Sequence, residues 1–98
     1  IVPATSALDA AYPNPFNAAT IIPFTVPAEA GASMVTVTIH DLLGQRVRTL
    51  LRSVRSPGRQ QVIWDGRGDD GSNLASGVYL IRLEAGTNRF SQKILYIQ

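Results

Sequence analysis

The stretch Ser33–His40, SMVTVTIH, decides the fold class of this chain because it alternates apolar and polar side chains. Val35, Val37 and Ile39 occupy every second position, so an extended backbone turns them to one face. β-Branched side chains at this spacing are typical of a strand with one buried and one exposed face. The stretch therefore predicts a half-buried β-strand.

A turn follows directly, in the sequence Asp41-Leu42-Leu43-Gly44. An Asp at the first position accepts hydrogen bonds from backbone N–H groups two residues on, and a Gly at the fourth tolerates positive φ. We therefore expect the chain to reverse here and to form a hairpin with a strand over residues 46–51.

The period of two extends over the rest of the chain. Further strands are predicted over residues 20–26, 60–64, 77–84 and 89–97, separated by turn-forming Gly, Pro, Asn and Asp. No segment carries an apolar stripe at helical spacing over three turns. Six strands, or about seven if residues 7–11 add an edge, predict an all-β, antiparallel sandwich. A partly open barrel is the alternative fold.

Length and composition exclude several classes of protein. The chain has 98 residues, enough for one small domain with one modest core, and no cysteine. It therefore has no disulfide, no thiolate nucleophile and no cysteine-based zinc site. No apolar run approaches the roughly 18 residues of a membrane span.

The chain starts at Ile1, with neither an initiator Met nor a signal pattern. We therefore expect a piece of a longer protein, whose targeting signal lies upstream. In this interpretation residues 1–11 are a linker or an edge strand next to an upstream domain.

The net charge is only +2, which is a weak argument for nucleic-acid binding. The distribution of charge is more informative, because no acidic residue lies between Asp41 and Asp65. This interval holds a candidate basic patch, formed by Arg46, Arg48, Arg52, Arg55 and Arg59. The favoured interpretation is a solvated strand face and loop. The alternative is a surface that contacts a polyanion.

Chemically active residues are few and poorly combined. His40 is the only histidine, and its neighbour Asp41 would point to the opposite face of a strand, so a catalytic triad is not expected. Asp69 and Asp70 lie in a Gly-rich segment without the apolar wall that acid–base catalysis needs. Calcium in residues 65–71 is a weaker alternative, because an arginine stands where an EF-hand-like loop needs an oxygen ligand. We expect no catalytic residue, no cofactor and no metal, and hence no enzyme.

Trp64 is the only tryptophan and shares a strand face with Val62. A carbohydrate-binding sandwich usually presents several aromatic rings in one plane, and no such set accompanies Trp64. We therefore favour packing of this ring in the core over stacking on a sugar.

Four sequence blocks together resemble a known family in order and spacing. They are Tyr12-Pro13-Asn14-Pro15-Phe16-Asn17, Asp41-Leu42-Leu43-Gly44-Gln45-Arg46-Val47, Val62-Ile63-Trp64-Asp65-Gly66-Arg67 and Ala75-Ser76-Gly77-Val78-Tyr79. The chain resembles the C-terminal sorting domain of type IX (Por) secretion and the related immunoglobulin-like domain of the flagellar hook-capping protein. The resemblance implies a seven-stranded immunoglobulin-like sandwich, with residues 12–98 as the sorting domain.

The resemblance also implies a function. In this family the domain is a non-catalytic address at the C-terminal end of a secreted cargo, often a glycoside hydrolase or a peptidase. The implied partners are the type IX translocon, a sortase-like peptidase and anionic lipopolysaccharide. The implied location is the bacterial cell surface or the extracellular space, reached through the periplasm. We expect a monomer that neither binds nucleic acid nor spans a membrane.

Four residues match the parts of the family pattern that are tied to export: Gly77, Tyr79, Gly86 and Lys93. The plain alternative is that the glycines form turns and that the lysine blocks edge-to-edge association of a strand. Two other functions stay open beside the sorting module. One is a carbohydrate-binding or other accessory interaction module of a secreted enzyme, and the other is a hook-cap-like assembly domain.

Overall fold

The computed structural model describes residues 7–26 and 31–98, and the regular elements in these residues are all β-strands. The strands are β1 (Ala7–Leu8), β2 (Thr20–Val26), β3 (Ser33–His40), β4 (Arg46–Arg55), β5 (Gly58–Trp64), β6 (Gly77–Ala85) and β7 (Asn88–Tyr96). Six of them have seven residues or more, and β1 is a pair of residues at an edge. Within the described ranges, no helix is long and apolar enough to cross a membrane.

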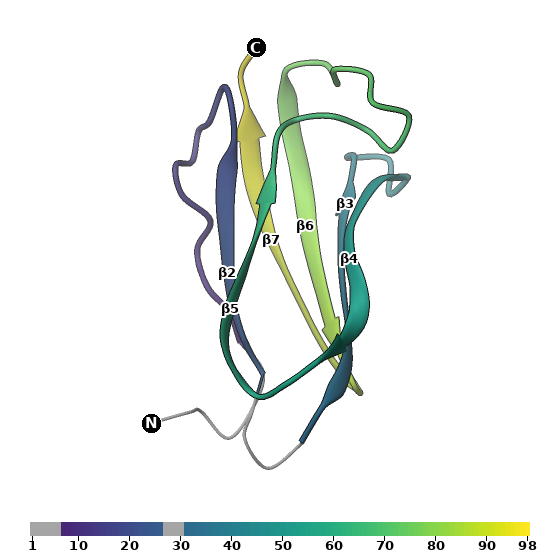
Figure 1. The fold of residues 1–98 in the computed structure, drawn as a ribbon. Coiled ribbons are helices and arrows are strands. Elements are labelled where there is room, and N and C mark those ends of the chain that lie inside the picture. The colour runs from purple at the N-terminus through teal and green to yellow at the C-terminus, as the bar shows by residue number, and fades with distance from the viewer. Residues whose placement is uncertain (1–6, 27–30) are drawn as a thin grey trace.

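The strands form two antiparallel sheets that pack face to face (Figure 1). One sheet has the order β1-β2-β5 and the other has the order β4-β3-β6-β7. This arrangement confirms the predicted all-β, antiparallel sandwich and excludes the barrel. The edge strand expected over residues 7–11 is limited to Ala7 and Leu8, which pair with Thr25 and Phe24 of β2.

β4 extends four residues beyond its predicted end at residue 51. In this extension Arg52 lies opposite Thr36 of β3, so backbone pairing continues where the apolar alternation has ended. The register between β3 and β4 also shifts twice, which places an extra β4 residue at each bulge. As a result, both Val47 and Leu50 pack against the core.

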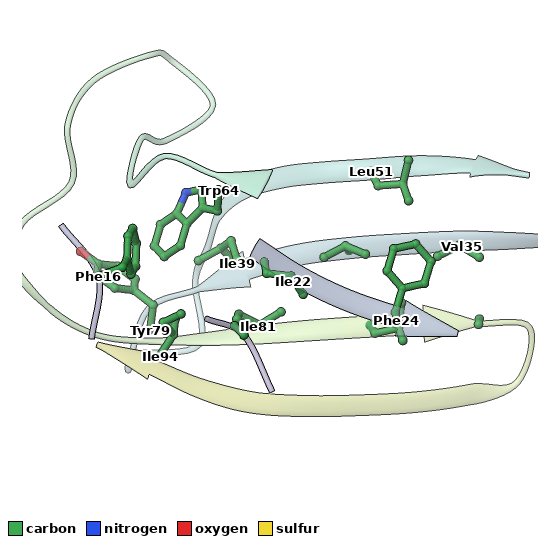
Figure 2. Packing of buried hydrophobic residues seen from close by; sticks show 14 of the residues in the cluster. Phe16, Ile22, Phe24, Val35, Ile39, Leu51, Trp64, Tyr79, Ile81 and Ile94 are labelled. Carbon is green, nitrogen blue, oxygen red and sulfur yellow. The ribbon is translucent and has the colours of Figure 1, made fainter. Parts of the chain in front are cut away.

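The core fills the space between the inner faces of the two sheets (Figure 2). Alternate residues of the long strands supply its side chains. They are Ile22, Phe24 and Val26 from β2, Val35, Val37 and Ile39 from β3, Leu51 from β4, Trp64 from β5, Tyr79, Ile81 and Leu83 from β6, and Ile94 and Tyr96 from β7. The inward faces expected from the period of two are therefore confirmed.

Four aromatic side chains, which we call the aromatic cluster, close one end of the core. The Trp64 ring centroid lies 5.2 Å from that of Phe16, 5.4 Å from that of Tyr79 and 6.0 Å from that of Tyr96. Trp64 is fully buried, and its Nε1–H donates to the carbonyl of Arg67 at 3.0 Å. The prediction of core packing is confirmed, and this ring has no face free to stack on a sugar.

The segment before β2 ties the two sheets together. Tyr12 exchanges backbone hydrogen bonds of 3.0 and 2.8 Å with Ile21 of β2. Further along, the Phe16 N–H donates to the carbonyl of Leu95 at 3.0 Å, and the Phe16 carbonyl accepts from the N–H of Ile97 at 2.9 Å. The segment thus crosses from one sheet to the edge of the other and delivers the Phe16 ring to the aromatic cluster.

Residues that precede this crossing also pack on the sandwich. Ala11 is buried in the core, and its N–H donates to the side-chain oxygen of Gln92 in β7 at 3.0 Å. The side-chain nitrogen of Gln92 donates in turn to the carbonyl of Asp9. The earlier part of the predicted linker, residues 1–6, lies outside the described residues.

We expect the substitution Phe16→Ala to lower the free energy of unfolding by about 3–5 kcal/mol, because it leaves a cavity in the aromatic cluster. Equilibrium urea unfolding of the purified domain measures this change. Leu43→Ala is the control, because the Leu43 side chain is 86% exposed. It should change the free energy of unfolding by less than about 0.5 kcal/mol. Equal effects of the two substitutions would contradict the proposed role of the cluster.

Burial raises the pKa of the Tyr79 phenol, and electrostatic interactions with Asp41 and Tyr96 add to this shift. The neutral hydroxyl donates to the carbonyl of Ala75 at 2.6 Å, which a phenolate cannot do. Because the pKa is higher in the folded than in the unfolded state, the stabilising contribution is complete below the ordinary pKa near 10. It is lost as the pH rises through the folded-state pKa.

The substitution Tyr79→Phe should therefore flatten the fall in unfolding free energy above about pH 10. Urea unfolding at several pH values below and above about pH 10 measures how steeply the unfolding free energy falls with pH. Tyr12→Phe removes a hydroxyl from a residue that is 53% exposed and should keep the steeper slope of the unaltered domain. An unchanged slope in Tyr79→Phe would show that this phenol does not couple folding to pH.

Candidate functional site

The four residues matched to the export pattern lie on one hairpin, formed by β6, the turn at Gly86 and β7. Gly77 is the first residue of β6, and Lys93 lies in β7 opposite Leu80. Tyr79 faces inward and is only 7% exposed, so it belongs to the core and is not available to a partner. The structure therefore brings the four residues to one supersecondary element but not to one surface.

Gly86 and Lys93 are the exposed members of this set. Gly86 has a φ of 61°, a left-handed conformation that side chains with a Cβ rarely adopt, so its place in the turn is a backbone requirement. Lys93 lies on the outer face of its sheet, and its carbonyl accepts a long hydrogen bond of 3.5 Å from the Asn14 side chain. Of the four matched residues, these two are the ones that another molecule can contact.

The structure divides the predicted basic patch among several surfaces. Arg46 and Arg52 lie on the outer face of the β4-β3-β6-β7 sheet, opposite His40 and Thr36 of β3. Arg55 ends β4 and donates to the hydroxyl of its neighbour in that strand, Ser53. Arg59 lies in β5, which belongs to the other sheet. These arginines do not form one patch, although they lie close together in the sequence.

Arg48 has a structural role at the edge of β4. Its guanidinium donates to the carbonyls of Arg67 at 3.1 Å and Gly68 at 3.3 Å, and it lies 3.6 Å from the carboxylate of Asp65. Arg48 therefore holds the loop that follows β5 against β4.

The same loop is held by Asp69. The Asp69 carboxylate accepts from the Thr49 N–H at 2.9 Å, and the Asp69 N–H donates to the Val47 carbonyl at 3.0 Å. Figure 1 shows the long connection between β5 and β6 arching over this side of the sandwich. The Gly- and Asp-rich loop is thus an extra pairing partner for the β4 edge.

The loop carboxylates face separate protein donors. Asp70 accepts from the hydroxyl of Ser72 at 2.6 Å and from its N–H at 3.0 Å, and these bonds lower the pKa of Asp70. Asp65 accepts from the Arg67 N–H at 3.1 Å. In the part of the chain that the structure describes, no three His, Cys, Asp or Glu residues come together as a metal site would require.

His40 and Asp41 have local partners rather than each other. The His40 ring nitrogens lie 3.0 Å from the Thr38 hydroxyl and 3.4 Å from the Gly44 carbonyl. The Asp41 carboxylate accepts from two N–H groups of the turn, at 2.9 Å each. Both residues therefore stabilise the hairpin between β3 and β4.

A hollow of about 620 Å³ lies beside the aromatic cluster. Its lining residues are Asn17, Ala18, Asp65, Arg67, Asn73, Tyr96 and Gln98. Side-chain amides and the Asp65–Arg67 ion pair, with a separation of 3.8 Å, supply its polar groups. This lining offers hydrogen bonds to a ligand but no pairing of a nucleophile with a histidine.

A second group of cations was missed in the sequence. The strand register places Arg82 of β6, and Arg89 and Lys93 of β7, on the outer face that also carries the two outward arginines of β4. We call the full set the basic sheet face: Arg46, Arg52, Arg82, Arg89 and Lys93. Its members are far apart in the sequence. The sequence indicates them only in that each one occupies an outward position of the alternation in its own strand.

Several known proteins are similar to this chain. The FlgD Ig-like domain family matches residues 13–89. The basal-body rod modification protein FlgD of Escherichia coli (strain K12) is 30% identical over 99 residues, which cover 98% of this chain and 43% of that protein. The chain therefore spans less than half the length of this relative.

Solved structures with a similar fold include two from Porphyromonas gingivalis. The dimeric latent PorU superimposes with a TM-score of 0.77 at 19% identity, over 99% of this chain and 10% of PorU. PorZ, described as an essential bacterial surface component of the type IX secretion system, superimposes with a TM-score of 0.59 at 23% identity. That match covers 94% of this chain and 12% of PorZ. At these identities the likeness concerns the fold alone.

The family match starts in the segment that crosses between the sheets and reaches the start of β7, so it takes in most of the core of the sandwich and the loop after β5. With most of its length matched in this way, the chain belongs to the FlgD Ig-like domain family.

Proposed function

We propose that this domain is a non-catalytic sorting and anchoring module that directs an upstream secreted cargo through type IX secretion to the bacterial cell surface. The observation that carries the proposal is that all four residues matched to the export pattern converge on the β6–β7 hairpin. Two of them, Gly86 and Lys93, are exposed there. A fold shared with PorZ, a component of that secretion system, supports the same assignment.

The division of the hairpin into buried and exposed positions gives each residue a role in this proposal. Tyr79 anchors β6 in the core, and its hydrogen bond to the Ala75 carbonyl fixes the start of the strand. Gly86 shapes the turn, and Lys93 offers a positive charge on the outer face. A type IX translocon would contact the exposed pair, whereas the buried tyrosine keeps the hairpin in a recognisable shape.

The remaining partners follow from the same proposal. A sortase-like peptidase would separate the domain from its cargo, and the cargo would be joined to anionic lipopolysaccharide or released outside the cell. The hydrogen-bonded carboxylates of the loop after β5 and the local bonds of His40 support a module without catalysis. The domain would act as a monomer.

A hook-cap-like assembly domain is the second candidate function. The observation that favours it is the family match, together with the 30% identity to the Escherichia coli FlgD. A carbohydrate-binding module that stacks a sugar on Trp64 is not supported, because Trp64 is buried in the aromatic cluster.

The sorting function is tested by fusing residues 1–98 behind a periplasmically targeted fluorescent protein, in a bacterium that has type IX secretion. We expect fluorescence at the cell surface or in the medium. Lys93→Ala should leave most of the reporter in the periplasm, because it removes the exposed charge of the hairpin. Arg59→Ala is the matched control, since it removes an exposed charge from the other sheet and should preserve export.

A reporter that stays in the periplasm with the unaltered domain would contradict the sorting function. Equal export of the Lys93→Ala and Arg59→Ala fusions would contradict the role of Lys93 alone. The second candidate is tested by replacing the Ig-like domain of Escherichia coli FlgD with this chain. Restored swimming in soft agar would favour assembly over sorting.

A further inference from the structure

The outer face of the β4-β3-β6-β7 sheet gathers charge of one sign. The basic sheet face holds five of the nine cationic side chains of the protein, and Glu84 is the only carboxylate at an outward position of these strands. This face therefore has a net charge of +4, whereas the whole chain has +2. The remaining four arginines are outnumbered by six carboxylates, so the rest of the chain has a net charge of −2.

The strand register sets the spacing of these charges. One row across the sheet begins with Arg52 in β4 and ends with Arg89 in β7. Four residues further along β3, β6 and β7, Arg46 and Lys93 occupy the two ends of another row, and Arg82 lies in the row between these two rows. With strands about 4.8 Å apart and alternate residues about 7 Å apart, the cations outline a patch about 14 Å on each side. This size suits several repeating units of an extended polymer.

The charges of this patch are largely uncompensated. Arg89 lies 3.6 Å from the carboxylate of Glu84. Among residues 7–26 and 31–98, no carboxylate lies within 4.0 Å of the side-chain nitrogens of the other four cations. Arg52 and Lys93 are exposed to solvent, and Arg82 is half-buried. A cluster of like charges without internal partners attracts an anion that spans several of them.

The side chains between the cations indicate which class of anion fits this face. Thr36 and Ser91 bring hydroxyl groups, which donate and accept hydrogen bonds, into the rows that hold Arg52 and Arg82. The outward positions of the four strands include no phenylalanine, tyrosine or tryptophan, whereas single-stranded nucleic acid is bound by stacking on such rings. Met34 and Val54 form an exposed apolar pair, but they lie beyond the row of Arg52, at one end of the face.

We infer that the basic sheet face binds an acidic polysaccharide, an extended chain of sugars that carry carboxylate or sulfate groups. Its anionic groups would pair with the five cations, and its hydroxyls would bond to the threonine and serine between them. Charge complementarity and the hydroxyl groups between the cations favour this partner. Insertion into a bilayer would require a broader apolar area, and single-stranded nucleic acid would require stacking rings. The inference does not depend on the sorting function.

The test is affinity electrophoresis of the purified 98-residue domain in gels that contain polygalacturonate, with neutral dextran as the control polymer. We expect retardation by polygalacturonate alone, and a loss of retardation as salt is raised towards about 1 M. The double variant Arg52→Gln/Arg82→Gln should bind on the order of tenfold more weakly, because two ion pairs are lost.

The matched control is Arg55→Gln/Arg59→Gln, which has the same net charge but keeps all five cations of the face. It should retain most of the affinity, and thermal unfolding of both variants checks that each is folded. Equal weakening in the two double variants would overturn the inference, since binding would then follow net charge alone. Absence of retardation in polygalacturonate, or stronger binding to duplex DNA or to phosphatidylglycerol vesicles, would overturn it as well.

Discussion

The packing of Trp64 against Phe16, Tyr79 and Tyr96 is the contact on which the rest of the sandwich depends. It joins the segment before β2, the end of β5, the start of β6 and the end of β7, so four distant parts of the chain meet in one cluster. Tilted and edge-on aromatic pairs add to the free energy gained from burial. The cluster also constrains the loop after β5, because a Cβ at Gly66 would lie 2.5 Å from Cζ of Tyr96. Only glycine lets the loop backbone pass this close to the ring.

This constraint determines which surfaces of the domain are free. Because the loop after β5 is held beside the cluster, Asp69 reaches the backbone of Thr49 and closes part of the β4 edge. At the other edge of the same sheet, Phe16 pairs with the backbone of β7. Open strand edges invite pairing with other chains, and here both edges of the larger sheet are partly occupied from within. The outer face of that sheet stays open for contacts with other molecules.

Alternation in the sequence was sufficient to predict the six long strands and their inward faces, because a period of two reports directly which side chains are buried. It failed where pairing continues without burial, as in residues 52–55 of β4. The prediction that the arginines of residues 46–59 form one patch was wrong. It rested on their nearness in the sequence, which does not report their nearness in space. Successive strand residues point to opposite faces, and the chain changes sheets between β4 and β5, so Arg48 and Arg59 leave the surface that holds Arg52. The row across the sheet that begins with Arg52 ends with Arg89 of β7, and only the strand register reveals this.

The separation of inward and outward residues explains why the fold alone does not assign the function. The aromatic cluster and the apolar core use one face of each strand, and substitutions on the other face cost little stability. A protein as different in sequence as PorU, which is 19% identical, can therefore share the sandwich with this chain. Function must be argued from the outward residues. In this domain Lys93 is matched to the export pattern and also belongs to the basic sheet face, whereas Arg52 and Arg82 belong to the face and are not matched to export. Those two arginines distinguish polysaccharide binding from export recognition, because changing them leaves the exposed positions of the hairpin matched to export intact.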